Sequence, residues 1–399
     1  MIQVAVFGYG TVGSGVVEVI EKNKAEINKK AGEELNVKYI LDLRDFPGDP
    51  YEDKVVHDVE TILNDPEVQI ICETMGGLKP AYDYTKRALL AGKSVCTSNK
   101  ELVATHGPEL IQIAHDNQCN YLFEASVGGG IPIIRPLNYS LTAEKIDAIT
   151  GILNGTTNYI LSKMEKEGAD FADVLKEAQE KGYAERNPEA DVEGYDACRK
   201  IAILSSLMCG KNVNYEDIYT EGITKITSTD FVYAKAMNKT IKLLAQSKEE
   251  DGKFYAMVSP CMIGMDHPLS MVNDVFNAVF VHGNMLGDSM YYGRGAGKLP
   301  TASAVVSDVV DCARHIGKVI MCFWDAEKVS LTGIEQASRK FFVRVSADKA
   351  QAAKETFGNV ETVDANVTGE FAFVTDVMTE KEFNEKAEKV GIISRIRME

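Results

Sequence analysis

The chain has 399 residues, of which 45% are hydrophobic, and its 59 Asp and Glu outnumber 43 Lys and Arg to give a formal net charge of -16. Because single hydrophobic cores stop growing at roughly 250 to 300 residues, this length predicts two or three domains. The acidic balance argues against a general nucleic-acid-binding protein or a protein of anionic membranes, since both classes depend on clustered Lys and Arg.

The N-terminal segment has the pattern of a strand, a glycine loop and a helix. The run IQVAVF is followed by GYGTVGSG and then by VVEVIEKNKAEINKK, whose apolar residues have helical spacing. Further strand-like runs, separated by helix-like segments such as 80–91, follow at 37–43, 68–72, 93–97 and 121–123. This alternation predicts an α/β fold with a Rossmann-type doubly wound parallel sheet.

The pattern changes after about residue 135. A strand is predicted over 144–153 and helices over 158–168 and 171–182. A polar loop then leads into a helix at 195–209, whose later part IAILSSLMC is apolar on every side and is therefore expected to be buried. A second glycine loop, GRGAGKLP, precedes a predicted helix at 301–317.

The tail, from about residue 340, predicts a small separate α+β domain. Its strands are expected at KFFVRVSA, 360–363, 369–375 and IISRIRM, and its helices at AQAAKETF and 380–390. The resulting order is β-α-β-β-α-β.

The sequence shows no targeting pattern and no transition-metal pattern. No stretch approaches about 18 consecutive apolar residues, and the N-terminus enters a strand without the parts of a signal peptide, so we expect a cytoplasmic protein. The eight cysteines are scattered without a CxxC pair, which favours reduced, buried thiols. The six histidines form no HExxH-like motif.

Gly8, Gly10 and Gly13 form a GxGxxG motif between the first strand and the first helix. Glycines at this spacing permit a tight turn and let a dinucleotide pyrophosphate approach the N–H groups of the helix N-terminus. The motif therefore predicts a dinucleotide site, and an ordinary glycine turn is the alternative.

Charged residues at the end of the second predicted strand bear on the choice of cofactor. Arg44 could hold the 2'-phosphate of NADP, whereas Asp42 or Asp45 could bind the free ribose hydroxyl of NAD. All three could equally be solvated charges, and these residues leave the choice between NADP and NAD open.

Two lysines stand at positions suited to chemistry. Lys100 follows a strand, and open α/β sheets bind ligands at the carboxyl ends of their strands. Asp196 and Lys200 share one face of the helix that becomes wholly apolar, so the carboxylate could orient a buried lysine that donates a proton. An exposed lysine and a plain helical ion pair are the alternatives.

Acidic residues mark two further candidate sites. Glu185 and Asp191, in the loop before that helix, could bind a substrate ammonium or could be solvated. Glu124 precedes three glycines, and a carboxylate beside accessible backbone carbonyls suits a hard monovalent cation. A buried turn without an ion is an equal alternative for this segment.

Taken together, these segments resemble the homoserine dehydrogenase family. GILNGTTNYIL and the block at 182–204 are the most specific of the matching stretches. In the family's order, and over roughly residues 1 to 320, the stretches are GYGTVGSGV, ETMGGLKPA, TSNKELVATHG, FEASVGGGIPIIRPL, GILNGTTNYIL, GYAERNPEADVEGYDACRKIAIL and GRGAGKLPTASAVVSD.

The resemblance implies an enzyme that interconverts L-homoserine and L-aspartate 4-semialdehyde with NADP or NAD, with NADP favoured, in threonine and methionine biosynthesis. It assigns proton transfer to Lys200 beside Asp196, places Lys100 near the nicotinamide and the substrate, and gives substrate contacts to Glu185 and Asp191. Cofactor contacts are implied for Gly8, Gly10, Thr11, Val12, Gly13, Arg44, Thr74, Lys100, Gly182, Glu185 and Gly297. A sodium or potassium ion is implied at Glu124, Val127, Gly129 and Ile131.

The resemblance also implies three domains. These are a nucleotide-binding domain at 1–135 completed by about 293–325, a central substrate-binding and dimerisation domain at 136–292, and the tail at 338–399. The tail resembles the ACT regulatory domain through its strand order, the run GEFAFVTD and the closing ISRIRM, although it is shorter than usual. Threonine as an effector, and a homodimer or homotetramer, follow as expectations.

Two other functions compete with this one. A different Rossmann reductase of amino-acid metabolism has no obvious use for Glu185, Asp196 and Lys200 together. A catalytically silent sensor, which would bind a dinucleotide and an amino acid, is disfavoured by the intact Lys100 and Lys200.

Overall fold

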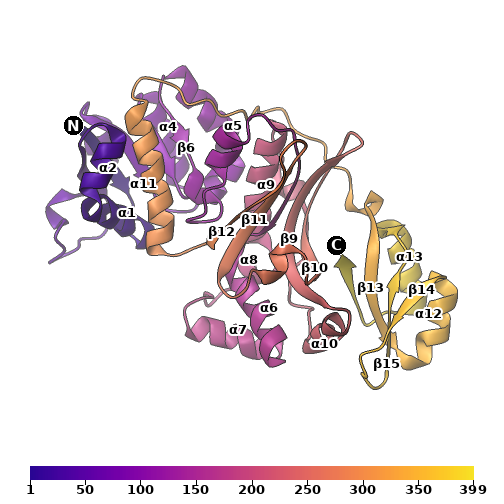
Figure 1. Cartoon of the computed structure of the whole chain (residues 1–399). Helices are drawn as coiled ribbons and strands as arrows, with labels where there is room; N and C mark the ends of the chain where they lie inside the picture. Colours follow the sequence, from indigo (N-terminus) through magenta and orange to yellow (C-terminus); the bar gives the residue numbers. More distant parts are fainter. The chain divides into compact units, whose positions relative to one another are not determined.

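The computed structural model describes residues 1–399, which divide into two compact units. Unit 1 comprises Met1–Lys145, Ala202–Asn214 and Tyr291–Val329, and unit 2 comprises Ile146–Ile201, Tyr215–Met290 and Ser330–Glu399. Each unit therefore combines segments that are far apart in the sequence, which the colours of Figure 1 follow along the chain.

Unit 1 is built on a 6-stranded sheet in which the paired strands are parallel. The spatial order β3-β2-β1-β4-β5-β6 is that of the Rossmann fold, so the predicted doubly wound parallel sheet is confirmed. Nearly continuous apolar runs form these strands because helices cover both faces of such a sheet. The strands are β1 (Ile2–Phe7), β2 (Leu35–Leu41), β3 (Val55–Val56), β4 (Val68–Glu73), β5 (Ser94–Thr97) and β6 (Tyr121–Leu122).

The helices of unit 1 pack in two groups, α1 with α2 and α11, and α4 with α5 (Figure 1). Helix α11 begins at Lys298, earlier than predicted, because Pro300 is tolerated in a first turn, where N–H groups have no helical acceptor. The helices are α1 (Thr11–Lys22), α2 (Lys24–Ala31), α3 (Val59–Leu63), α4 (Ala81–Leu90), α5 (Lys100–Asp116) and α11 (Lys298–Arg314), with short turns η1 (Glu52–Lys54), η2 (Glu124–Ser126) and η3 (Pro136–Ser140).

Unit 2 is built on a mixed, 11-stranded sheet. Its main path is β12-β11-β7-β9-β10-β17-β13-β15-β14, in which β10 and β17 are parallel. The strands are β7 (Ile146–Ile152), β8 (Tyr219–Thr220), β9 (Lys239–Glu250), β10 (Lys253–Gly264), β11 (Phe276–Gly283), β12 (Gly287–Arg294, which continues into unit 1), β13 (Ser338–Ser346), β14 (Val360–Val363), β15 (Glu370–Thr375), β16 (Met378–Thr379) and β17 (Ser394–Met398).

The helices of unit 2 lie between β7 and β9 in the sequence, and within the tail. Helix α6 starts at Gly155, earlier than predicted, because the Asn154 side chain accepts a hydrogen bond from the Thr157 N–H and so caps it. The helices are α6 (Gly155–Glu167), α7 (Phe171–Glu180), α8 (Glu189–Val192), α9 (Tyr195–Cys209, which continues into unit 1), α10 (Ser228–Ala236), α12 (Ala350–Phe357) and α13 (Glu380–Val390), with turns η4 (Tyr215–Asp217), η5 (Pro268–Met271), η6 (Ile334–Gln336) and η7 (Ala347–Lys349).

The tail has the predicted β-α-β-β-α-β order, with the short β16 added. Helices α12 and α13 cover one face of its strands (Figure 1), and their core contains Phe341, Phe357, Phe373 and Phe383. The closing strand β17 lies between β13 and β10. The tail sheet is therefore continuous with the central sheet of unit 2.

Two further observations concern the helices and the thiols. None of the helices is both long and apolar enough to cross a membrane. The cysteines are free thiols, and all except Cys209 are buried, as the sequence predicts. The Sγ atoms of Cys96 and Cys312 lie 3.6 Å apart in the core of unit 1.

Candidate active site

The glycine loop of unit 1 lies between β1 and the N-terminus of α1. Gly10 occupies the N-cap position, where it offers no side chain to the N–H groups of the first turn. A Cβ on Gly10 would meet no atom within 4 Å, so the space in front of this helix end is open. Thr11 and Val12 begin the helix, and Gly13 packs against the backbone of Gly8. Uncapped N–H groups beside open space are what a pyrophosphate requires.

Asp42 and Arg44 form one ion pair at the end of β2. The Arg44 guanidinium donates from Nε and Nη2 to the Asp42 carboxylate, at 3.0 Å each, and the Tyr9 N–H donates to the same carboxylate at 2.8 Å. The hydrogen bonds from Arg44 lower the pKa of Asp42 to about 2, because their effect exceeds the opposing effect of burial. Asp42 thus fixes the glycine loop, Arg44 remains an exposed cation beside it, and exposed Asp45 pairs with His57.

A buried network joins the ends of β4 and β5. The Glu73 carboxylate accepts hydrogen bonds from the Thr97 hydroxyl at 2.6 Å and from the Met75 N–H at 2.8 Å. Burial raises the pKa of Glu73. Thr74, next in the chain, places its hydroxyl 2.9 Å from the carbonyl oxygens of both Phe7 and Gly8, so it holds the end of β1.

Lys100 is the first residue of α5, at the carboxyl end of β5. Asn99 caps this helix, because its side-chain oxygen accepts the Leu102 N–H, and its amide donates to the Gly77 carbonyl at 2.6 Å. The loop after β4 and the start of α5 are therefore tied together. Gly297, the exposed N-cap residue of α11 with φ of 115°, immediately precedes Lys298, whose carbonyl packs against Gly15 of α1.

The Glu124 carboxylate is occupied by backbone donors. Its Oε1 accepts the N–H groups of Ile133 and Ile134, at 2.6 and 2.8 Å, and its Oε2 accepts the Arg135 N–H at 2.8 Å. Burial nevertheless raises the pKa of Glu124. Oxygen ligands for a cation in this segment would therefore come largely from the carbonyls of buried Val127, Gly129 and Ile131.

Unit 2 brings Lys200 and two acids into one buried cluster. The Lys200 Nζ donates to Asp196 Oδ2 at 2.6 Å and to the Leu153 carbonyl at 2.7 Å. The Asn154 amide donates to Asp191 Oδ1 at 2.7 Å and to Asp196 Oδ2 at 2.9 Å. Asp196 and Lys200 are only 7% and 9% exposed. This lysine is therefore held in one position by a carboxylate and a carbonyl.

Asn154 is the residue of this cluster that we did not single out from the sequence. It lies in the GILNGTTNYIL stretch, where its capping role was the available signal. Asp191 comes from α8, and burial together with the nearby Asp196 raises its pKa. Gly182, just after α7, and Glu185 lie exposed in the loop that leads to α8.

Two family models match this chain, and both describe homoserine dehydrogenases. A family model described as Homoserine dehydrogenase matches residues 132–310, and one described as Homoserine dehydrogenase, NAD binding domain, matches residues 8–124. The homoserine dehydrogenase of Bacillus subtilis is 42% identical over 322 residues, which cover 79% of this chain and 73% of the relative.

Solved structures extend the likeness to the tail. The crystal structure of a homoserine dehydrogenase from Thiobacillus denitrificans has a TM-score of 0.89 and 35% identity, covering 100% of this chain and 98% of that one. A hyperthermophilic archaeal homoserine dehydrogenase in complex with NADPH has a TM-score of 0.67 and 29% identity, covering 78% and 97%. The chain belongs to the homoserine dehydrogenase family and is an NAD(P)-dependent oxidoreductase.

Proposed function

We propose that Lys200 is the proton donor and acceptor when this enzyme interconverts L-homoserine and L-aspartate 4-semialdehyde. The observation that carries the proposal is the position of its ammonium group, which donates to Asp196 and to the Leu153 carbonyl. An ammonium has three N–H donors, so one is left for the reacting oxygen. Bound NAD(P) supplies the hydride chemistry, and Lys200 gives its proton to the developing alkoxide or removes it in the reverse direction.

The neighbouring residues give Lys200 its setting. Asp196 orients the ammonium, and Asn154 keeps the two carboxylates of Asp191 and Asp196 together. We assign the ammonium of homoserine to Asp191, because a second cation would relieve the repulsion between Asp191 and Asp196, and to Glu185, which lies in the loop that leads to α8. Lys100, at the end of β5, is assigned to the nicotinamide side of the substrate.

The experiment that tests this function is the absorbance of the reduced nicotinamide. Adding L-homoserine and NADP or NAD to the protein, in buffer with sodium or potassium, should produce a rise in that absorbance. L-Serine, which lacks one methylene group, is the matched control substrate. No rise with either cofactor would contradict the proposal.

We favour NADP as the cofactor, because Arg44 is an exposed cation beside the glycine loop and the archaeal relative is in complex with NADPH. Arg44→Ala is expected to raise the KM for NADP roughly tenfold while that for NAD changes little, since only NADP loses a bond to its 2'-phosphate. Michaelis constants for both cofactors check this. An equal rise of the KM for NADP and of the KM for NAD would instead indicate that Arg44 acts through Asp42 on the glycine loop.

We also propose a monovalent cation, sodium or potassium, at Glu124, Val127, Gly129 and Ile131. The three N–H groups already bound to the Glu124 carboxylate favour backbone carbonyls as the principal ligands. A cation there would stabilise the segment that leads from η2 toward η3. We further infer three functional domains with the boundaries given above, and a homodimer or homotetramer.

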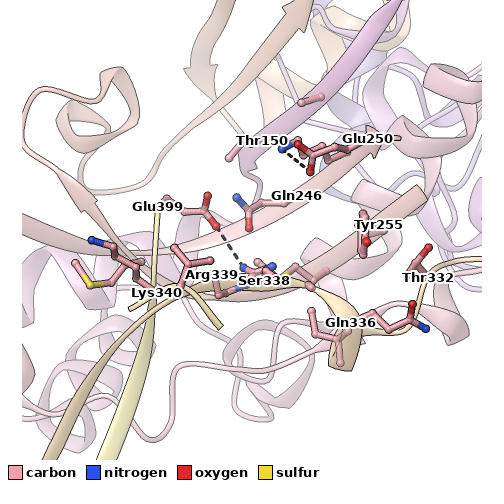
Figure 2. Close-up of a pocket in the computed structure, with 18 of the residues that line it drawn as sticks. Thr150, Gln246, Glu250, Tyr255, Thr332, Gln336, Ser338, Arg339, Lys340 and Glu399 are labelled. Atoms are coloured by element: carbon pink, nitrogen blue, oxygen red, sulfur yellow. Dashed lines mark hydrogen bonds and ion pairs between the residues drawn. The ribbon is translucent and has the colours of Figure 1, made fainter. Parts of the chain in front are cut away.

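The tail is proposed to be an ACT-like regulatory module with threonine as its effector. A cavity of about 930 Å³ lies within unit 2 and is lined by both the central sheet and the tail (Figure 2). Thr150, Gln246 and Tyr255 line it from β7, β9 and β10, and Arg339 and Glu399 from the tail. Arg339 and Glu399 pair with each other at 3.4 Å, and an amino acid could replace this pair by giving its carboxylate to Arg339 and its ammonium to Glu399.

Threonine is expected to raise the Tm of the wild-type chain and to leave that of Arg339→Met unchanged. The reason is that a ligand stabilises the state it binds, and the variant lacks the cation for its carboxylate. A point variant is preferred to truncation near Ser338, because β17 is part of the central sheet. No threonine-dependent shift in the wild type would reject the effector site and leave the tail structural.

A further inference from the structure

Glu221 follows β8 and receives three side-chain donors on a single oxygen. Its Oε2 accepts from Arg397 Nη1 at 2.6 Å, from the Tyr219 hydroxyl at 2.9 Å and from Arg395 Nη2 at 3.3 Å. Burial alone would raise the pKa of Glu221, but Arg395 and Arg397 outweigh it and lower that pKa. The three donors therefore hold the Glu221 carboxylate in one position.

Both arginines belong to β17, the closing strand of the tail. The Arg397 side chain is only 1% exposed, and its guanidinium also donates to both oxygens of Glu380 on α13. Arg339, at the wall of the cavity in Figure 2, lies 3.6 Å from the same Glu380 carboxylate. The tail thus holds Glu221 through a set of ion pairs centred on buried Arg397 and Glu380.

The residues after Glu221 lie against the turn that joins α8 to α9. The Ile223 N–H donates to the Val192 carbonyl at 2.8 Å. Gly222 sits so close to this turn that a Cβ would overlap the Val192 carbonyl oxygen and lie 2.5 Å from the Glu193 Cα, so only glycine fits. This turn directly follows Asp191 and precedes Asp196, and both acids meet at Asn154.

We propose that Glu221 is a positioning residue for homoserine, through which the tail arginines Arg395 and Arg397 set the place of Asp191. The contacts run from the two guanidinium groups to Glu221, and then through Gly222 and Ile223 to the turn that joins α8 to α9. The inference rests on the proposed role of Asp191 in binding the substrate ammonium. It makes the affinity for homoserine depend on the tail even without an effector.

A second ion cluster between the tail and the rest of unit 2 provides a matched control. Arg344 of β13, 5% exposed, donates to Asp230 of α10 at 2.8 Å and to Glu370 of β15 at 2.6 and 2.8 Å. This cluster is as buried as that of Arg397, and it ties the tail to α10 instead of to the segment at 219–223. Its loss should weaken the fold without moving Asp191.

The test compares Glu221→Gln with Arg344→Met in the full chain. Glu221→Gln is expected to raise the KM for homoserine roughly tenfold, with the KM for the cofactor unchanged and kcat reduced less. Arg344→Met should lower Tm at least as much while the KM for homoserine stays near wild type. In an Asp191→Asn background, Glu221→Gln should add little, because both changes act on one contact.

The outcomes separate the two proposals. If Asp191→Asn raises the KM for homoserine but Glu221→Gln does not, the inference about Glu221 is wrong and the role of Asp191 stands. An equal rise of that KM in Glu221→Gln and Arg344→Met would also overturn it, since general loosening of the tail would then suffice. If Asp191→Asn itself leaves the KM unchanged, the proposed substrate contact fails first.

Discussion

Replacing Lys200 by alanine is expected to lower kcat at least about 100-fold, the usual contribution of a positioned general acid. The Lys200 ammonium is a buried donor that Asp196 and the Leu153 carbonyl hold in place, so its loss removes the positioned proton donor for the reacting oxygen. The dissociation constant of the cofactor should stay near wild type, because the lysine acts on the reacting oxygen. Steady-state kinetics and nicotinamide fluorescence measure the two quantities separately.

Lys242 supplies the matched control for this variant. It is a second buried lysine in unit 2, and its Nζ donates to the Val272 carbonyl at 2.8 Å and to Asn273 at 2.9 Å. Lys242→Met should therefore lower Tm without a comparable loss of kcat. If Lys200→Ala and Lys242→Met lose activity in parallel with their loss of Tm, the role of Lys200 is structural.

Gly13→Ala is expected to be the most damaging change in the glycine loop. A Cβ at this position would overlap the Gly8 carbonyl oxygen and lie 2.8 Å from the Thr74 hydroxyl, so β1, α1 and the loop after β4 would have to separate. Forcing a methyl group into packed structure costs about 1 to 3 kcal/mol, and this site also holds the cofactor loop. Both a lower Tm and at least roughly tenfold weaker cofactor binding should follow.

Gly10→Ala distinguishes folding from cofactor binding at the same loop. No atom lies within 4 Å of its added Cβ, so the Tm should be unchanged. Cofactor binding should still weaken, because the methyl group would occupy the space in front of the α1 N-terminus. Thermal melts and cofactor titrations of Gly10→Ala and Gly13→Ala measure the two effects. Unchanged cofactor binding in Gly10→Ala would mean that the pyrophosphate does not bind in front of α1.

The sequence by itself determined the features that depend on local spacing. Residues 2–31 predict strand, glycine turn and helix, because a continuous apolar run, a GxGxxG turn and helical periodicity are each set within a few residues of chain. The structure confirms the strand and the turn, but it divides the predicted helix into α1 and α2 at Asn23, whose backbone is not helical. The four-residue spacing of Asp196 and Lys200 likewise places both on one helix face, and the structure has them 2.6 Å apart.

Helix starts were less well predicted than helix existence. The starts of α6 and α11 lie earlier than expected, because Asn154 caps the first and Pro300 is compatible with the first turn of the second. Helix propensity is low for the residues after Asn154, a glycine and two threonines, so periodicity alone misses this turn. Capping is a contact between one side chain and the backbone, so it produces no periodic pattern in the sequence.

Only the tertiary structure decided which distant segments supply the partners of these residues. Asn154 joins Asp191 to Asp196, and β17 enters the sheet beside β10, from where Arg397 reaches Glu221. The sequence predicts the existence of each element, but buried polar groups take their hydrogen-bond partners from whatever the packed chain brings near. Such pairings depend on the order of strands in the whole sheet, which no local pattern in this chain encodes.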